Sequence, residues 1–434
     1  MNENTSGQSG KNKPERAAYL FGWFYGWYVV AAIMLVLSIG SGLGFYNLSV
    51  YLRAFVSHGG FSVEATSMAT ACFFVASGIA GRGVGVLIER YDARLVITAG
   101  ALLSAMTMFG ASHVHELWQL YLFYALFGVG YSANTIIPCT TIIARWFSRR
   151  RSAALSIGST GLSLGGIALT PMSTRMISTM GFDGAAPWLA LIFVVGIIPV
   201  TWLVIRPSPL AYGIGPDGDP IARDDKGAPL PADGIDYRQA TRSRFFILMT
   251  LTFVFAMTAQ VGTIAHLFSL VSERTGSEDK GALALAIMAA ASITGRLIGG
   301  RALVSMSSRA FVIGLLLAQA STLVCFAFAQ SATALITTSL LFGFTVGNLL
   351  MMAPLLCAEA FGLKAYGEIF SLNQLYTVCG YASGPLLIGV LYGRSGGYGA
   401  AFICMALATL LAFVCIWMAG PVRALLQAQQ GQQG

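Results

Sequence analysis

Runs of about 20 apolar residues recur along the whole chain and are separated by short polar segments. Runs of this length can cross the hydrocarbon core of a bilayer as α-helices. The pattern therefore predicts an all-α integral membrane protein. Twelve transmembrane helices are predicted, near residues 27–52, 63–85, 95–112, 117–143, 153–178, 186–205, 245–271, 281–303, 310–329, 331–356, 369–391 and 398–418.

One long polar segment rich in Pro, Gly and Asp interrupts this pattern in the middle of the chain. Such a composition is typical of a linker, and it separates six predicted spans from six others. We therefore predict an N-terminal tail (1–26), a six-helix bundle (27–205), a linker (206–244), a second six-helix bundle (245–418) and a C-terminal tail (419–434).

The two halves share sequence features at a nearly constant offset in residue number. The segment "IAGRGVG" at 79–85 reappears as "ITGRLIG" at 293–299, and Pro171 aligns with Pro385, both at an offset of 214. Parallel repeats of six helices are expected to pack about an axis along the membrane normal, with a substrate cavity between them near the midplane. The repeat thus predicts a protein that rocks to expose its cavity to each side in turn.

Composition and charge placement support the membrane interpretation. The chain is 56% hydrophobic and 10% charged, with a mean hydropathy of +0.71, whereas soluble domains carry about 25% charged residues. Of the 26 Lys and Arg residues, five fall on the far side, one lies within a span, and the remaining 20 lie on the side of both termini. The positive-inside rule then predicts a cell (inner) membrane protein with cytoplasmic termini. The net charge of +8 reports this topology, so nucleic-acid binding is not expected.

The loop after the second span carries a recognisable motif. The segment "GVLIERYDAR" at 85–94 resembles the GxxxDRxGxR loop of the major facilitator superfamily, with Glu89 for the usual Asp and Asp92 for the usual Gly. The resemblance implies the major facilitator fold. It also implies an ion-pair latch at helix ends that closes the cytoplasmic side, which would involve Gly85, Glu89, Arg90 and Arg94.

A second motif narrows the resemblance. The segment "RWFSRRRSAALSIGSTGLSLGG" at 145–166 resembles the signature of the monocarboxylate transporter family. The segments "YGWYVV" at 25–30 and "AHLFSLVSERTG" at 265–276 are similar to bacterial members, which include oxalate–formate exchangers. The resemblance implies secondary active transport of a small organic anion, with a monocarboxylate as the expected cargo and a proton as the expected co-substrate.

Arg296 is the first candidate for binding that anion. Every other residue of the segment 281–300 is apolar, small or hydroxylated. A charge in a spanning helix is costly and normally faces a partner or a wet cavity, yet no Asp or Glu falls mid-span. A guanidinium can bind a carboxylate bidentately, and family members use an arginine at this position of the eighth span. The alternative is an arginine that snorkels to the cytoplasmic face near Arg301.

Two further basic residues leave alternatives open. His266 lies well inside a span, where it could carry a proton or bind substrate near Arg296, or simply form a structural hydrogen bond.

In the register with an offset of 214, Arg82 is the counterpart of Arg296, so two guanidinium groups could clamp a dicarboxylate. Aligning Gly85 with Gly300 shifts the register by one residue and turns Arg82 toward a gate or a neighbouring helix. We expect the gate and a monocarboxylate; dicarboxylate uptake or anion exchange is the alternative.

Neutral polar residues inside the spans are candidates for the rest of the cavity. Each could instead form a helix–helix hydrogen bond. The candidates are Tyr46, Asn47, Tyr51, Asn134, Gln260, Asn348, Asn373, Gln374 and Tyr376.

Other function classes find little support in the sequence. There is no GxxxxGK[ST] motif, no metal-ligand cluster and no catalytic triad within the spans, so we expect neither an ATP-driven pump, nor an enzyme, nor a cofactor or metal. A non-transporting membrane sensor on the same scaffold remains an alternative, although such sensors usually append a large soluble domain. We expect a monomer in the lipid bilayer.

Overall fold

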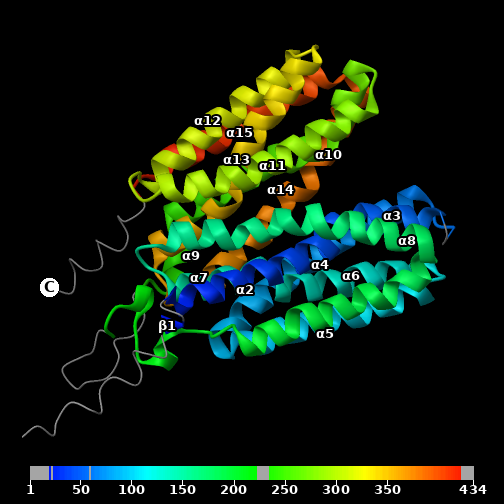
Figure 1. Cartoon of the computed structure of the whole chain (residues 1–434). Coiled ribbons are helices and arrows are strands. Elements are labelled where there is room, and N and C mark those ends of the chain that lie inside the picture. Colours follow the sequence, from blue (N-terminus) through cyan, green and yellow to red (C-terminus); the bar gives the residue numbers. More distant parts are fainter. Residues whose placement is uncertain (1–18, 21–22, 58–59, 222–233, 422–434) are drawn as a thin grey trace, which may run out of the picture.

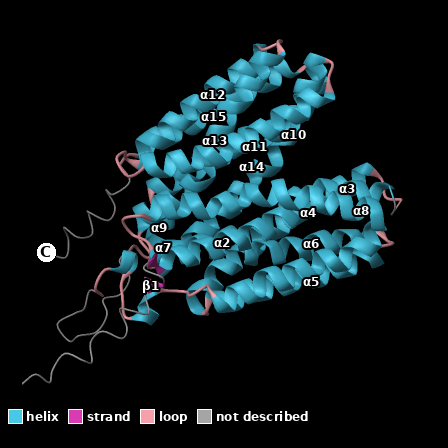
Figure 2. Ribbon diagram, viewed as in Figure 1, coloured by secondary structure: helices cyan, strands magenta, loops and turns pink. Residues whose placement is uncertain are grey.

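The computed structural model describes residues 19–20, 23–57, 60–221 and 234–421. The predicted tails at 1–26 and 419–434 and the middle of the linker lie largely or wholly outside these residues. Figures 1 and 2 show two bundles of long helices joined at the linker end. In the described part of the chain, strand is confined to one antiparallel pair, β1 (Tyr19–Leu20) and β2 (Trp23–Phe24).

The first bundle contains passes one to six. Its first pass is broken into three helical pieces and its fourth into two. The elements are α2 (Tyr25–Gly40), η1 (Ser41–Tyr46, a π-helix), α3 (Leu48–Ser57), α4 (Val63–Arg90), α5 (Ala93–Gly110), η2 (Ala111–His113), α6 (Leu117–Asn134), α7 (Ile136–Trp146) and α8 (Arg151–Leu203).

The helix α8 provides two passes rather than one. It is 53 residues long, and Gly181 in its middle has a left-handed φ of 72° with ψ 168°. Gly165 packs against Gly42, and Gly196 packs against Ile39 on the same pass. In a straight helix these two glycines would lie about 46 Å apart at 1.5 Å per residue, so the chain reverses at Gly181.

The linker and the second bundle follow. Only short helical turns occur in the described part of the linker, whereas passes seven to twelve are six long helices. The elements are η3 (Pro209–Tyr212), η4 (Pro216–Gly218), α9 (Tyr237–Arg242), α10 (Arg244–Thr275), α11 (Glu278–Ala302), α12 (Ser308–Phe328), α13 (Ala332–Phe361), α14 (Tyr366–Ser395) and α15 (Tyr398–Ala419).

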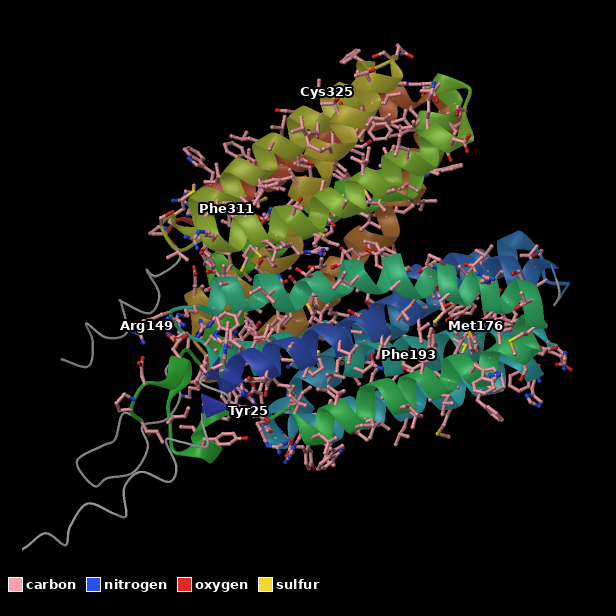
Figure 3. All side chains as sticks on the ribbon, in the orientation of Figure 1. Tyr25, Arg149, Met176, Phe193, Phe311 and Cys325 are labelled. Atoms are coloured by element: carbon pink, nitrogen blue, oxygen red, sulfur yellow. The ribbon has the colours of Figure 1, made fainter. Side chains whose placement is uncertain are left out.

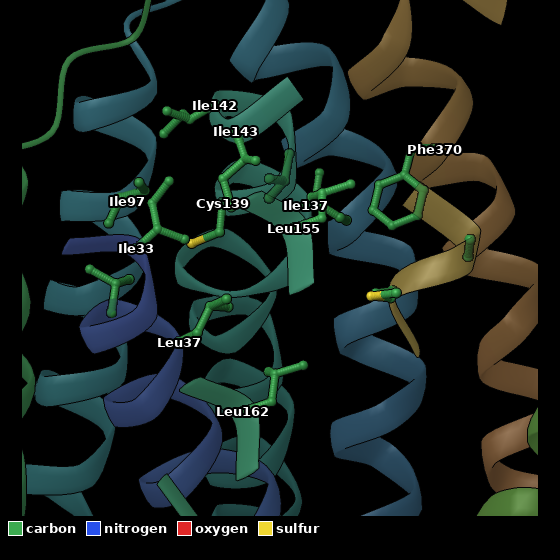
Figure 4. Packing of buried hydrophobic residues seen from close by; sticks show 14 of the residues in the cluster. Ile33, Leu37, Ile97, Ile137, Cys139, Ile142, Ile143, Leu155, Leu162 and Phe370 are labelled. Atoms are coloured by element: carbon green, nitrogen blue, oxygen red, sulfur yellow. The ribbon is translucent and has the colours of Figure 1, made fainter. Parts of the chain in front are cut away.

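Eleven helical segments of the described chain are long and apolar enough to cross a membrane, one of them being α8. Counting α8 twice gives the twelve predicted spans, so the protein is an all-α membrane protein of two six-helix repeats. Figure 4 shows how the first bundle is filled: Ile33 and Leu37 of α2 pack with Ile97 of α5, Leu155 of α8 and Cys139 of α7.

Glycine contacts reveal the structural register between the halves. A Cβ at Gly128 would meet the carbonyl oxygen of Phe73, and a Cβ at Gly343 would meet that of Met288. Small residues at such crossings let two helix backbones approach closely. Both members of the second pair lie 215 positions after their counterparts. The passes α4 and α11 therefore correspond in the register with an offset of 215, the one that also aligns Gly85 with Gly300.

Candidate functional site

A cavity of about 120 Å³ lies between the two bundles, several times larger than the ~10–15 Å³ that one water requires. Both halves contribute to its wall, as the predicted architecture requires. Lining residues are Ser41, Phe45, Tyr46, Phe74, Ser77, Gly78, Gly81, Tyr131, Ser132, Thr135, Ile136, Ile137 and Leu162 from the first bundle, with Gln260, Val261, Ile264, Arg296, Val346, Leu350, Gln374, Val378 and Tyr381 from the second.

Two interruptions in the helices of the first bundle occur at this cavity. The π-helix η1 supplies Ser41, Phe45 and Tyr46 to its wall. The break between α6 and α7 lies at Thr135, whose φ of −121° and ψ of −126° are not helical. Irregular backbone at membrane depth is tolerated where it lines a cavity, and π-helical turns concentrate at functional sites.

The fourth predicted span, 117–143, is one membrane-crossing segment in the structure, Leu117–Trp146, with a break at Thr135 that was not predicted. Pro138, the third residue of α7, is the signal in the sequence that could have found it. A proline has no N–H to donate to the carbonyl oxygen four residues earlier, and its ring clashes with that carbonyl. The π-helix η1 has no comparable signal, because its segment contains neither a proline nor a change of period.

Arg296 reaches the cavity from α11 and is only 1% exposed. Its Nε donates to the carbonyl oxygen of Gly347 at 3.0 Å, and its Nη1 donates to Oγ of Ser163 at 2.8 Å. Two of its five N–H groups are thereby used. Among the described residues no carboxylate pairs with it, and it is the one charged residue in the cavity wall. The protein thus holds a buried cation in a fixed orientation without a protein counter-ion.

Gln260 of α10 also lines the cavity and is 1% exposed. Its Oε1 is buried without a hydrogen-bond partner. A buried polar atom without a partner is costly, and here it borders the same cavity as Arg296. Because the two amide atoms of a glutamine exchange places by a flip of the side chain, the amide can present either a donor or an acceptor to a bound molecule.

We expect Gln260→Leu to weaken substrate binding by about tenfold or more, because one hydrogen bond to a charged group contributes about 1.5–3 kcal/mol. Gln319→Leu is the matched control. Gln319 is equally buried, but its Nε2 donates to Ala256 and Thr409 outside the cavity. The substrate affinities of the two purified variants provide the measurement; equal losses in both would argue against a role for Gln260 in the site.

Five predicted site residues face the interior of one bundle instead of the cavity. Each carries out the alternative role of a helix–helix or local hydrogen bond. Asn47 donates to Ser173 (2.7 Å), the hydroxyl of Tyr51 to Leu43 (2.8 Å), Asn134 to Ser104 (3.2 Å), Asn348 to Gly295 (2.9 Å) and Asn373 to Thr250 (3.1 Å). Of the neutral candidates, the structure brings Tyr46, Gln260 and Gln374 to the cavity.

His266 and Tyr376 are likewise not among the residues of the cavity wall. The Nε2 of His266 lies 3.2 Å from the carbonyl oxygen of Pro385, and its ring meets that of Tyr398 edge-on at 5.9 Å. A carbonyl oxygen only accepts hydrogen bonds, so Nε2 carries a proton. Tyr376 is 50% exposed on α14.

Arg82 lies outside the cavity wall as well. In the register with an offset of 215 the counterpart of Arg296 is Gly81, which lines the cavity without a side chain. The guanidinium of Arg82 instead lies 3.5 Å from Glu368 of α14 and 4.6 Å from the ring centroid of Tyr237 in α9. Arg82 therefore lies at a contact between the halves near the linker.

The two bundles touch at the linker end of α4 and α14. A Cβ at Gly85 would meet Ser371 and the carbonyl oxygen of Gly367. The carboxylate of Glu89 accepts from the backbone N–H of Gly367 at 2.7 Å and pairs with Arg145 at 2.9 Å. Glu89 thus links the first bundle to the second through the backbone of Gly367. Its ion pair with Arg145, which was not predicted, lies within the first bundle.

The other two predicted latch residues lie nearby without bridging the halves. Arg94 pairs with Asp92 at 2.6 Å. The hydrogen bonds from Arg94 to Asp92 hold the pKa of the Asp92 carboxyl below its ordinary value. Arg90 is exposed.

The linker itself also contacts this end of the protein. The carboxylate of Asp217, a non-glycine residue with φ 58°, accepts from the backbone N–H groups of Ser148 (2.8 Å) and Arg149 (2.7 Å), just before α8 begins. Arg149, which is labelled in Figure 3, also pairs with Asp219 at 2.7 Å. A carboxylate at a helix N-terminus satisfies donors that the helix leaves open. These acidic residues were not predicted, because the composition of the linker indicated only flexibility.

Comparisons with known proteins agree with this architecture. The sequence model of the Major Facilitator Superfamily matches residues 34–310 and 248–433. Monocarboxylate transporter 13 from Rattus norvegicus is 26% identical over 392 residues, which is 88% of this chain and 85% of that protein. The human organic anion transporter MFSD10 (TETRAN) has a TM-score of 0.70 and 16% identity over 90% of this chain and 99% of its own. The E. coli fucose:proton symporter FucP has a TM-score of 0.67 and 14% identity over 90% of this chain and 98% of its own.

Proposed function

Because the chain belongs to the Major Facilitator Superfamily, we propose that this transporter moves a small organic anion, preferably a monocarboxylate, together with a proton by alternating access. The observation that carries the proposal is Arg296, a buried cation in a cavity between the bundles that has no counter-ion among the described residues. A bound carboxylate would supply the missing negative charge. The similarity to monocarboxylate transporter 13 supports this class of cargo.

A single carboxylate fits the cavity better than two. Arg296 is the one charged residue of the described cavity wall, and its counterpart in the other half is Gly81. A second carboxylate in the same cavity would have no cation beside it and would carry a large desolvation cost. This favours a monocarboxylate over the alternative of dicarboxylate uptake.

The contacts between α4 and α14 suggest which step of the transport cycle the structure represents. We infer that the linker end faces the cytoplasm, since it carries most of the basic residues of the chain. With that end closed, the cavity would receive its anion from the opposite side, toward which the bundles diverge in Figure 1. A bound anion would neutralise Arg296 and so remove the free-energy cost of enclosing an unpaired charge. The opposite side of the cavity could then close.

Counterflow in proteoliposomes tests the proposal. Purified protein is reconstituted with one unlabelled carboxylate inside, and accumulation of labelled lactate, pyruvate, succinate or oxalate is followed at several pH values. We expect accumulation of monocarboxylates, with a rate that rises as the external pH falls. Accumulation of no carboxylate would contradict the proposal and would favour a different cargo or a sensor.

The source of the proton is tested by His266→Gln. A glutamine amide at this position would still donate a hydrogen bond to Pro385, the partner of His266 in the structure. Because His266 lies outside the cavity wall, we expect transport to keep its dependence on pH between about pH 5 and 8, the range in which histidine titrates. A pH-independent rate in this variant would instead identify His266 as the proton carrier.

A further inference from the structure

Besides Arg296, the wall of the cavity carries several aromatic side chains. Five aromatic side chains from four helices line it: Phe45 and Tyr46 of η1, Phe74 of α4, Tyr131 of α6 and Tyr381 of α14. Most of the other lining residues are aliphatic or glycine. Pockets lined in this way bind the body of a ligand through apolar contact, and a few polar groups set its orientation.

Three of these rings meet edge to face, which is a favourable geometry for aromatic pairs. Phe45 meets Phe74 with ring centroids 6.0 Å apart at 71° and meets Tyr46 at 5.3 Å and 88°. Such pairs contribute about 0.5–1.5 kcal/mol beyond the burial of apolar area.

A small hydrophilic acid would use this wall poorly. Lactate carries little apolar surface, so it would leave the phenylalanine rings and the aliphatic side chains of the wall without a partner. A ring attached to one carboxylate would instead place its charge on Arg296 and its apolar body against the aromatic side chains. We propose that the preferred cargo is an aromatic monocarboxylate of the phenylacetate class, an inference that rests on the proposed anion transport.

The first test compares three monoanions as competitors of labelled phenylacetate in proteoliposomes: phenylacetate, cyclohexylacetate and lactate. We expect phenylacetate to bind about ten- to hundredfold more tightly than lactate, the ratio that burial of a phenyl-sized apolar group gives. Cyclohexylacetate is expected to fall between them. Lactate as the stronger competitor would overturn the aromatic assignment but keep anion transport, and inhibition by none of the three would contradict both.

The second test uses Phe74→Leu and Tyr381→Leu. Each removes one ring from the wall but keeps an apolar side chain, and we expect each to reduce the preference for phenylacetate over lactate about two- to tenfold. Phe109→Leu is the control, because Phe109 is 56% exposed on α5 and does not line the cavity. Since the readout is a ratio of two substrates, a general loss of folded protein does not alter it. An unchanged ratio in both cavity variants would overturn the proposal.

Discussion

Replacing Arg296 with alanine is expected to abolish carboxylate transport and to lower anion affinity at least about 30-fold, because truncating one partner of a buried charge pair costs about 2–5 kcal/mol or more. The protein should still insert and fold. Arg296 makes two hydrogen bonds, to Gly347 and Ser163, but the desolvation of a buried charge opposes folding. We therefore expect the melting temperature of the apo protein to stay within a few degrees or to rise.

Arg296→Lys should also transport poorly. The Nε of Arg296 donates to Gly347 and its Nη1 to Ser163, which leaves the rest of the planar group for a carboxylate. A lysine ammonium has a single nitrogen. It cannot donate to Gly347 and Ser163 and also bind a carboxylate bidentately. Arg301→Ala, further along the same helix at an exposed position, is the control and should transport normally. Wild-type affinity in Arg296→Ala would refute the anion site.

The fold could be predicted because its main determinant, about 20 apolar residues per pass, is a local feature of the sequence. The position of Arg296 at the cavity could be anticipated for a similar reason, because the sequence places no carboxylate near it in the spans. The gap between the predicted spans 153–178 and 186–205 contains Gly181, where the chain reverses within α8. In the structure this gap is mostly helical, because helix continues on both sides almost up to Gly181.

Which way a polar side chain faces could not be predicted. Asn373 and Gln374 are adjacent in sequence and differ by about 100° around the helix, and only Gln374 lines the cavity, while Asn373 bonds to Thr250. The rotation of a transmembrane helix is set by its packing against neighbours, which an apolar pattern with little amphipathicity does not encode. The π-helix that brings Phe45 and Tyr46 to the cavity has the same origin in tertiary packing.

The repeat register shows how a shift of one position changes a functional hypothesis. An offset of 214 pairs Arg82 with Arg296 and suggests a dicarboxylate clamp, whereas an offset of 215 makes Gly81 the counterpart. Sequence matches alone supported both offsets. The backbone contacts of Gly128 with Phe73 and of Gly343 with Met288 favour the second one.

Gly85→Val is expected to reduce transport at least about fivefold by opening the linker-side gate. The valine Cβ would meet Ser371 and the backbone of Gly367, and overpacking of this kind costs about 1–3 kcal/mol. The clash exists only while α4 and α14 are in contact, so its cost falls on the state closed at the linker end and shifts the population toward the open one. Binding of anion from the opposite side should weaken in parallel.

Gly83→Val is the matched control for this substitution. It introduces the same side chain nearby in the same helix, where no atom lies within 4 Å of a Cβ and the position is exposed. The opening of the gate is measured by cysteine labelling. The seven native cysteines are replaced, and Ser152→Cys introduces a single cysteine at a buried position beside Gly300. We expect an impermeant maleimide applied to the linker side to label this position several-fold faster with Gly85→Val than with Gly83→Val. A steric clash that exists only in the closed state must increase the exposure of Ser152, which lies at the other linker-end contact between the halves. Equal labelling rates in the two variants would therefore mean that the contact at Gly85 does not hold the gate closed.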